Sequence, residues 1–140
     1  MILVDLNVLL DVVQKREPHY RPSAAVLEEA VRGRAVAALP SHALTTLHYL
    51  VARYQSGDVA DRAVDWLLGY FRIAPVRRDE LLRARGLAMK DFEDAVVAAA
   101  AEAIGCTAIV TRNVKDFALS PVEAMTPEEY LLADRKNAGK

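Results

Sequence analysis

Asp5 directly follows an apolar run, Ile2-Leu3-Val4, and precedes a second apolar stretch that begins at Leu6. The first run predicts a buried strand, which places the aspartate at the carboxyl end of that strand. Parallel α/β sheets bind their ligands outside the carboxyl ends of their strands. An ionised carboxylate in such a place must be solvated, paired or bound to a metal. Asp5 is therefore a candidate for a functional site.

Two further segments place polar side chains where they could join Asp5. Asp91 begins an alanine-rich helix, and Asp94 lies one turn later on the same helical face. An N-cap role is enough to explain Asp91 alone, whereas Asp94 borders the buried stripe of the helix and is the better candidate for a ligand. Asn113 and Asp116 follow the fourth predicted strand, although these residue types are also common in turns.

Carboxylates from these three segments would repel one another if the fold brought them together in a partly buried cleft. Ligands that are all oxygen suit Mg²⁺ or Mn²⁺, which bind a few carboxylates together with water and the phosphate of a substrate. The pattern therefore predicts a site in which a divalent metal supplies the missing positive charge.

The elements that must position these residues alternate between strands and helices. Apolar and β-branched runs predict strands at residues 2–4, 36–39, 71–76, 107–111 and 122–125, with helical segments between them. Asn7 and Ser41 are the predicted N-caps of the helices that follow the first two strands. Because parallel crossovers need helices, this alternation predicts a parallel sheet that is covered by helices on both faces.

The composition excludes several classes of protein. A chain of 140 residues with 26% charged residues predicts one globular domain, residues 1–133, and a polar tail, residues 134–140. The single cysteine, Cys106, excludes an intrachain disulfide and a cysteine-rich zinc site, and it favours a cytoplasmic location. No apolar run approaches the ~20 residues of a membrane helix. The net charge of −1 means that any contact with nucleic acid must be local.

The order of the acidic segments resembles that of PIN domains, the fold of VapC-type toxin ribonucleases. The matching segments are residues 2–11, Asp91-Phe92-Glu93-Asp94-Ala95 and residues 110–117, and the resemblance covers nearly the whole chain. It implies a three-layer α/β/α sandwich whose five-stranded parallel sheet has the order 3-2-1-4-5. It also implies an endoribonuclease that uses Mg²⁺ or Mn²⁺ to hydrolyse RNA phosphodiester bonds, with a small antitoxin protein and a second copy of the chain as partners.

Carried over residue by residue, the metal-binding and catalytic acids of the family fall on Asp5, Asp94 and Asp116. Four residues support them: Asn7, Thr46, Asp91 and Asn113. Many PIN domains carry a further Glu on the helix after the second strand, and Thr46 stands in that position here. A threonine hydroxyl can orient a metal-bound water but supplies no charge, so this departure leaves the number of bound metals open.

Several nearby residues can be explained without a functional role. His42 and His48 flank Thr46, but we leave both out of the metal set, because histidines are common on helices that cover sheet edges and neutral imidazole suits softer metals. Four basic residues could either contact RNA phosphates or form a solvated surface: Lys15, Arg16, Arg112 and Lys115.

Two other functions stay open at this point. A PIN-fold module that has lost catalysis together with its Glu could bind RNA or regulate a partner, and a test of metal-dependent cleavage separates it from a nuclease. An aspartyl phosphatase also places its nucleophile after the first strand. That enzyme needs a second Asp two residues later, where this chain has Asn7.

Overall fold

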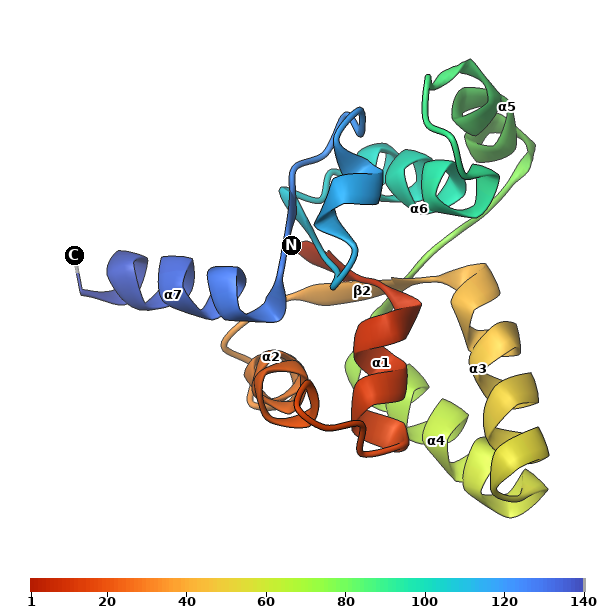
Figure 1. Cartoon of the computed structure of the whole chain (residues 1–140), viewed down its shortest axis with the longest axis vertical. Helices are drawn as coiled ribbons and strands as arrows, with labels where there is room; N and C mark the ends of the chain where they lie inside the picture. Colours follow the sequence, from red (N-terminus) through yellow and green to blue (C-terminus); the bar gives the residue numbers. More distant parts are fainter. Residues whose placement is uncertain (140) are drawn as a thin grey trace.

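A five-stranded parallel sheet forms the middle layer of the computed structural model, which describes residues 1–139 (Figure 1). The strand order is β3-β2-β1-β4-β5, and all four pairings are parallel. The strands are β1 (Ile2–Val4), β2 (Ala37–Pro40), β3 (Arg72–Ala74), β4 (Ala108–Val110) and β5 (Ala124–Met125). The predicted fold class and strand order are therefore confirmed.

Helices cover both faces of this sheet. They are α1 (Leu6–Val13), α2 (Tyr20–Val31), α3 (Ser41–Tyr54), α4 (Gly57–Tyr70), α5 (Arg78–Gly86), α6 (Phe92–Ala103), the 3₁₀ helix η1 (Val114–Phe117) and α7 (Pro127–Ala138). Helices α1 to α4 lie on one side of the sheet, and α5 and α6 lie on the other (Figure 1). Side chains of β1 alternate accordingly, since Ile2 and Val4 join the first core and Leu3 joins the core under α6.

The alanine-rich sequence of α6 suits a helix that is buried on most sides. Ala98 and Ala101 pack in the core against the sheet, whereas Ala95 and Ala99 pack with Ala84 of α5. Alanine loses no side-chain entropy on burial and lets neighbouring elements approach closely. Tight packing on two sides fixes the direction of α6, and therefore the place of the acidic residues at its amino end.

Two predicted N-caps are wrong. Helix α1 begins at Leu6, and Asp5 caps it through a carboxylate that accepts from the Leu6 backbone N–H at 2.8 Å. Ser41 is the first residue of α3 after Pro40, and its hydroxyl accepts instead from the backbone N–H of Val76 at 3.2 Å. Asp5 and Pro40 each have an extended backbone and directly precede the first helical residue. Each helix therefore follows its strand without a connecting loop.

Helix α7 begins with a capping box, in which the Thr126 hydroxyl and the Glu129 carboxylate each accept from the backbone N–H of the other residue. The helix continues to Ala138, so residues 134–138 of the predicted polar tail are helical. Lys140 lies outside the described residues, and the domain boundary at residue 133 stays a prediction. None of the helices within residues 1–139 is long and apolar enough to span a bilayer.

Candidate active site

Asp5 stands between β1 and α1 and is only 5% exposed. Its Oδ1 accepts from the backbone N–H of Leu6 at 2.8 Å, and its Oδ2 accepts from the hydroxyl of Thr111 at 2.9 Å. Burial raises the pKa of the Asp5 carboxyl above its ordinary value; the hydrogen bond from Thr111 opposes this effect, and the negative charge of Glu93 adds to it. The carboxylate is thus held firmly in a place that disfavours its charged form.

Hydrogen bonds from Asn7 and Thr111 join the ends of β1 and β4 around Asp5. Asn7 donates from Nδ2 to the Thr111 hydroxyl oxygen at 3.2 Å, and its Oδ1 accepts from the backbone N–H of Arg112 at 3.2 Å. Thr111 is completely buried and also accepts from the backbone N–H of Asn113 at 3.1 Å. Sequence reasoning missed Thr111, although a hydroxyl at the end of a predicted buried strand was an available signal.

Three acidic residues cluster at the amino end of α6. Asp91 caps the helix, because its Oδ1 accepts from the backbone N–H of Asp94 at 2.9 Å. Asp91, Glu93 and Asp94 can each offer one carboxylate oxygen, and these atoms lie within 4.8 Å of one another. Asp91 and Asp94 were predicted from the sequence but Glu93 was not, because an acidic residue in the first turn of a helix is ordinary.

The electrostatics of Asp94 link this cluster to β1. Burial, followed by the negative charges of Asp91, Glu93 and Asp5, raises the pKa of Asp94 to about 7. Asp5 and Asp94 are 89 positions apart in the sequence, yet they lie close enough in the fold for one charge to affect the other. The expected repulsion between carboxylates of different segments is therefore present at this edge of the sheet.

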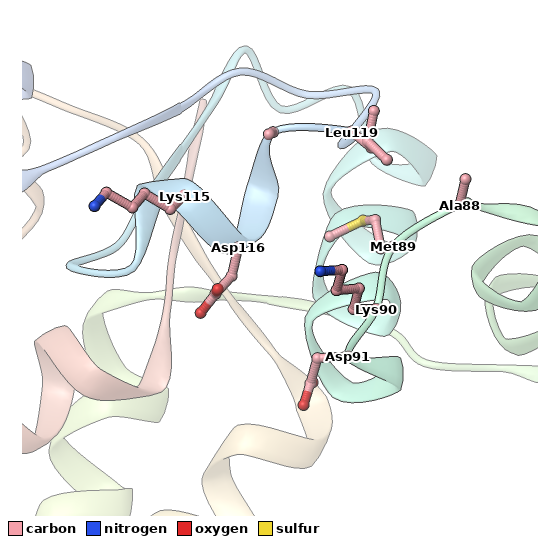
Figure 2. A pocket seen from close by; sticks show the side chains of 8 residues that line it. Ala88, Met89, Lys90, Asp91, Lys115, Asp116 and Leu119 are labelled. Atoms are coloured by element: carbon pink, nitrogen blue, oxygen red, sulfur yellow. The ribbon is translucent and has the colours of Figure 1, made fainter.

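Asp116 approaches the acidic group from η1. It is exposed and lines a cavity of ≈ 280 Å³ together with Lys90, Asp91 and Lys115. Figure 2 shows the carboxylates of Asp91 and Asp116 pointing toward the same side of this cavity, with the Lys90 side chain next to Asp91. Asp116 therefore lies across this cavity from Asp91, but it is not part of the cluster of Asp91, Glu93 and Asp94, and its place in the metal set stays a prediction. Asn113 is exposed and lines an adjacent cavity with Asp116.

Helix α3 contacts the acidic group through His42. Its Nε2 lies 2.9 Å from Oε1 of Glu93. The hydroxyl of Thr46 donates to the backbone carbonyl of His42 at 3.3 Å and is exposed, so Thr46 bonds within its own helix. His48 points elsewhere and pairs with Asp61 of α4 at 2.7 Å.

The four basic residues predicted to contact phosphate lie in different places. Lys115 lines the cavity beside Asp116, whereas Arg112 donates from Nε to a carboxylate oxygen of Asp11 at 2.8 Å. Lys15 and Arg16 follow the carboxyl end of α1, about 12 Å of helix away from Asp5. A phosphate that these two residues contacted would therefore lie well away from the acids.

The set of possible ligands is suited to a hard divalent cation. Asp91, Glu93 and Asp94 offer oxygen atoms only, and Asp5 adds its negative charge from the end of β1. Burial and the neighbouring carboxylates both raise the pKa of Asp94 and so disfavour its negative charge when no cation is present. A bound Mg²⁺ or Mn²⁺ fits both observations.

The fold is similar to solved structures of toxin proteins at low sequence identity. Mycobacterium tuberculosis VapC20, described as a sarcin–ricin loop cleaving toxin, has a TM-score of 0.68 at 16% identity, over 84% of this chain and 94% of that chain. A toxin–antitoxin complex from Klebsiella pneumoniae gives 0.69 at 23% identity, over 91% and 98%. FitAcB from Neisseria gonorrhoeae gives 0.70 at 22% identity, over 91% and 99%. A search of curated proteins found no match to this sequence.

A family model described as a PIN domain matches residues 1–115. This range includes Asp5, the whole of α3 and α6, and β4, and it ends one residue before Asp116. The match covers well over half of the chain and agrees with the strand order of the sheet. The chain therefore belongs to the PIN domain family.

Proposed function

We propose that this chain is an endoribonuclease that depends on Mg²⁺ or Mn²⁺ and acts as the toxin of a toxin–antitoxin pair. The observation that carries this proposal is the cluster of Asp91, Glu93 and Asp94, whose carboxylate oxygens lie within 4.8 Å of one another at the amino end of α6, with Asp5 near enough for its charge to act on Asp94. Like charges are held together mainly at functional sites, where a ligand or substrate offsets their repulsion.

In this proposal Asp5, Asp94 and Asp116 are the metal-binding and catalytic acids, within a nuclease domain of residues 1–133. A bound Mg²⁺ supplies a water of lowered pKa and neutralises charge on the phosphate. The protein contributes orientation, since Leu6 and Thr111 fix the two oxygens of Asp5. Asp91 holds the first turn of α6 in place through its hydrogen bond to the Asp94 backbone.

Basic residues beside the acids support a substrate with phosphates. Lys90 and Lys115 line the same cavity as Asp91 and Asp116, so a phosphate could be held next to the metal-binding acids (Figure 2). Lys115 was among the predicted contacts, and Lys90 becomes a further candidate because it lines the same cavity. RNA is the proposed substrate because the similar VapC20 is described as cleaving the sarcin–ricin loop.

An antitoxin protein and a second copy of the chain are the proposed partners. Support comes from the similar Klebsiella pneumoniae structure, which is described as a toxin–antitoxin complex. Helices α3 and α4 also carry large apolar side chains that are at least half exposed: Tyr49, Tyr54, Leu68 and Tyr70. Exposed apolar surface of this kind is common where proteins associate. A cytoplasmic location is part of the proposal and agrees with the free thiol of Cys106.

The test is a cleavage assay on total RNA with Mg²⁺, Mn²⁺ or EDTA, in which the new RNA ends are mapped. We expect cleavage at discrete positions with either metal, none with EDTA, and none with the Asp94→Asn variant. RNA binding without cleavage would instead favour the regulatory module. Hydrolysis of a phosphate monoester without RNA cleavage would favour the phosphatase.

A further inference from the structure

The first turn of α3 reaches the acidic site through a fixed histidine. His42 Nε2 lies 2.9 Å from Glu93 Oε1, and the His42 side chain is 29% exposed. Its other ring nitrogen, Nδ1, is buried and has no hydrogen-bond partner within residues 1–139. The imidazole is therefore partly buried at the first turn of α3, with one nitrogen directed at a carboxylate of α6.

The contact with His42 restricts the orientation of the Glu93 carboxylate. Its side chain is 50% exposed, and a free glutamate at the second position of a helix samples many rotamers. In the structure its carboxylate can place an oxygen within 4.8 Å of ligand atoms of Asp91 and Asp94. The charge of Glu93 also raises the pKa of both Asp5 and Asp94, so it lies on the side of the site where these two acids meet.

Helix α3 itself supplies no carboxylate at this place. Thr46 turns its hydroxyl to the carbonyl of His42, one helical turn earlier. The contribution of α3 is the imidazole of His42, and the adjacent carboxylate comes from α6. The hydrogen bond from His42 uses Oε1 of Glu93 and does not involve Oε2.

We propose that Glu93 is a fourth carboxylate of the metal site in this chain, and that His42 is the positioning residue that directs it. This inference rests on the proposed function, because it needs a divalent cation at the acids. Residues that hydrogen-bond to a metal ligand fix its orientation, and their loss typically weakens metal binding about 10- to 100-fold.

Helix α3 provides a matched control. His48 makes the same kind of contact, with its Nε2 2.7 Å from Oδ1 of Asp61 on α4. The two side chains of this pair are 43% and 68% exposed, and neither belongs to the acidic cluster. Replacement of His48 therefore removes a histidine–carboxylate contact from α3 without any change at the proposed metal site.

The experiment is calorimetric titration of Mn²⁺ into the full chain and into His42→Gln, Glu93→Gln, the double variant and His48→Gln. We expect both single variants at the site to weaken Mn²⁺ binding at least about tenfold. The double variant should bind no more weakly than Glu93→Gln, because His42 acts only through Glu93. His48→Gln should bind as the wild type does. Circular dichroism checks the fold, and His42→Asn replaces His42→Gln if that variant is unfolded.

Three results would overturn the inference in different ways. If Asp94→Asn abolishes Mn²⁺ binding but Glu93→Gln does not weaken it, Glu93 is no ligand and the proposed function survives. If the losses of His42→Gln and Glu93→Gln add up in the double variant, His42 does not act through Glu93. If the wild type binds no Mn²⁺, the metal site of the proposed function fails together with the inference.

Discussion

Arg112 donates from Nε to Oδ2 of Asp11 at 2.8 Å and so ties the segment after β4 to the middle of α1. Asp11 is completely buried; its Oδ2 also accepts from the Ser23 hydroxyl of α2 at 3.0 Å, while its Oδ1 has no partner within residues 1–139. The backbone N–H of Arg112 donates to Asn7, which in turn bonds to Thr111 beside Asp5. The ion pair therefore holds together the two segments that position Asp5.

Loss of the arginine charge should leave Asp11 as an uncompensated buried charge. We expect Arg112→Met to lower the free energy of unfolding by about 3 kcal/mol, measured by urea denaturation. Arg32→Met is the control, because the Arg32–Glu28 pair is 60% and 49% exposed. Its effect should stay below about 1 kcal/mol. Equal effects of the two variants would mean that the buried pair does not stabilise the fold.

The sequence alone predicted those features that depend on a residue's immediate neighbours in the chain. The apolar runs and the alanine-rich segment gave the strands, the order of helices and the places of Asp5, Asp91 and Asp94, because a residue at a strand end or a helix start is identified by its immediate neighbours.

Pairings across the fold could not be predicted in this way. Asp11 and Arg112 are 101 positions apart, and His42 and Glu93 are 51 positions apart. Each of these residues is unremarkable among its neighbours, and only the tertiary fold brings the partners together, Arg112 from the segment after β4 to α1 and His42 from the first turn of α3 to the amino end of α6. The predicted caps Asn7 and Ser41 were wrong because each helix begins directly after its strand. Asp5, at the end of β1, is itself the N-cap of α1.

Asp5→Asn keeps the size of the side chain but removes its charge. We expect RNA cleavage to fall at least about a hundredfold, because the variant loses an electrostatic contribution to the reaction. The fold should persist, since burial already disfavours the charged form of Asp5. Asp65→Asn, an exposed change on α4, should cleave at the wild-type rate. Wild-type activity in Asp5→Asn would remove Asp5 from the catalytic set.

Divalent metal should stabilise the folded chain. A ligand that binds only the folded state at 100 times its Kd adds about 2.7 kcal/mol, so we expect millimolar Mn²⁺ at low salt to raise Tm by several degrees. Differential scanning fluorimetry measures this shift, and Asp94→Asn should lose most of it. An unchanged Tm in the wild type would argue against a metal site at the acids.

In the absence of metal, the raised pKa of Asp94 should make stability depend on pH. Its pKa is about 7 in the folded chain and 3.8 ordinarily, so between these values the folded state binds more protons than the unfolded state. Stability should then fall as pH rises through this window and be recovered on acidification. We expect Tm in EDTA to be roughly 2–4 °C higher at pH 5.5 than at pH 7.5. Asp94→Asn should reduce this difference in Tm between the two pH values. If the variant shows the same difference as the wild type, groups other than Asp94 cause it.

Thr46 and Thr45 offer a direct comparison of two neighbouring positions on α3. Both hydroxyls donate to the carbonyl of His42, at 3.3 and 2.8 Å, and both side chains are exposed. Thr46 lies four residues after His42 and shares its helical face, whereas Thr45 is turned about 100° away from Thr46. We therefore expect Thr46→Glu to add a carboxylate beside the acids and to tighten Mn²⁺ binding, and Thr45→Glu to have no such effect. Calorimetry on both folded variants decides the matter: equal affinities would show that position 46 does not face the metal site.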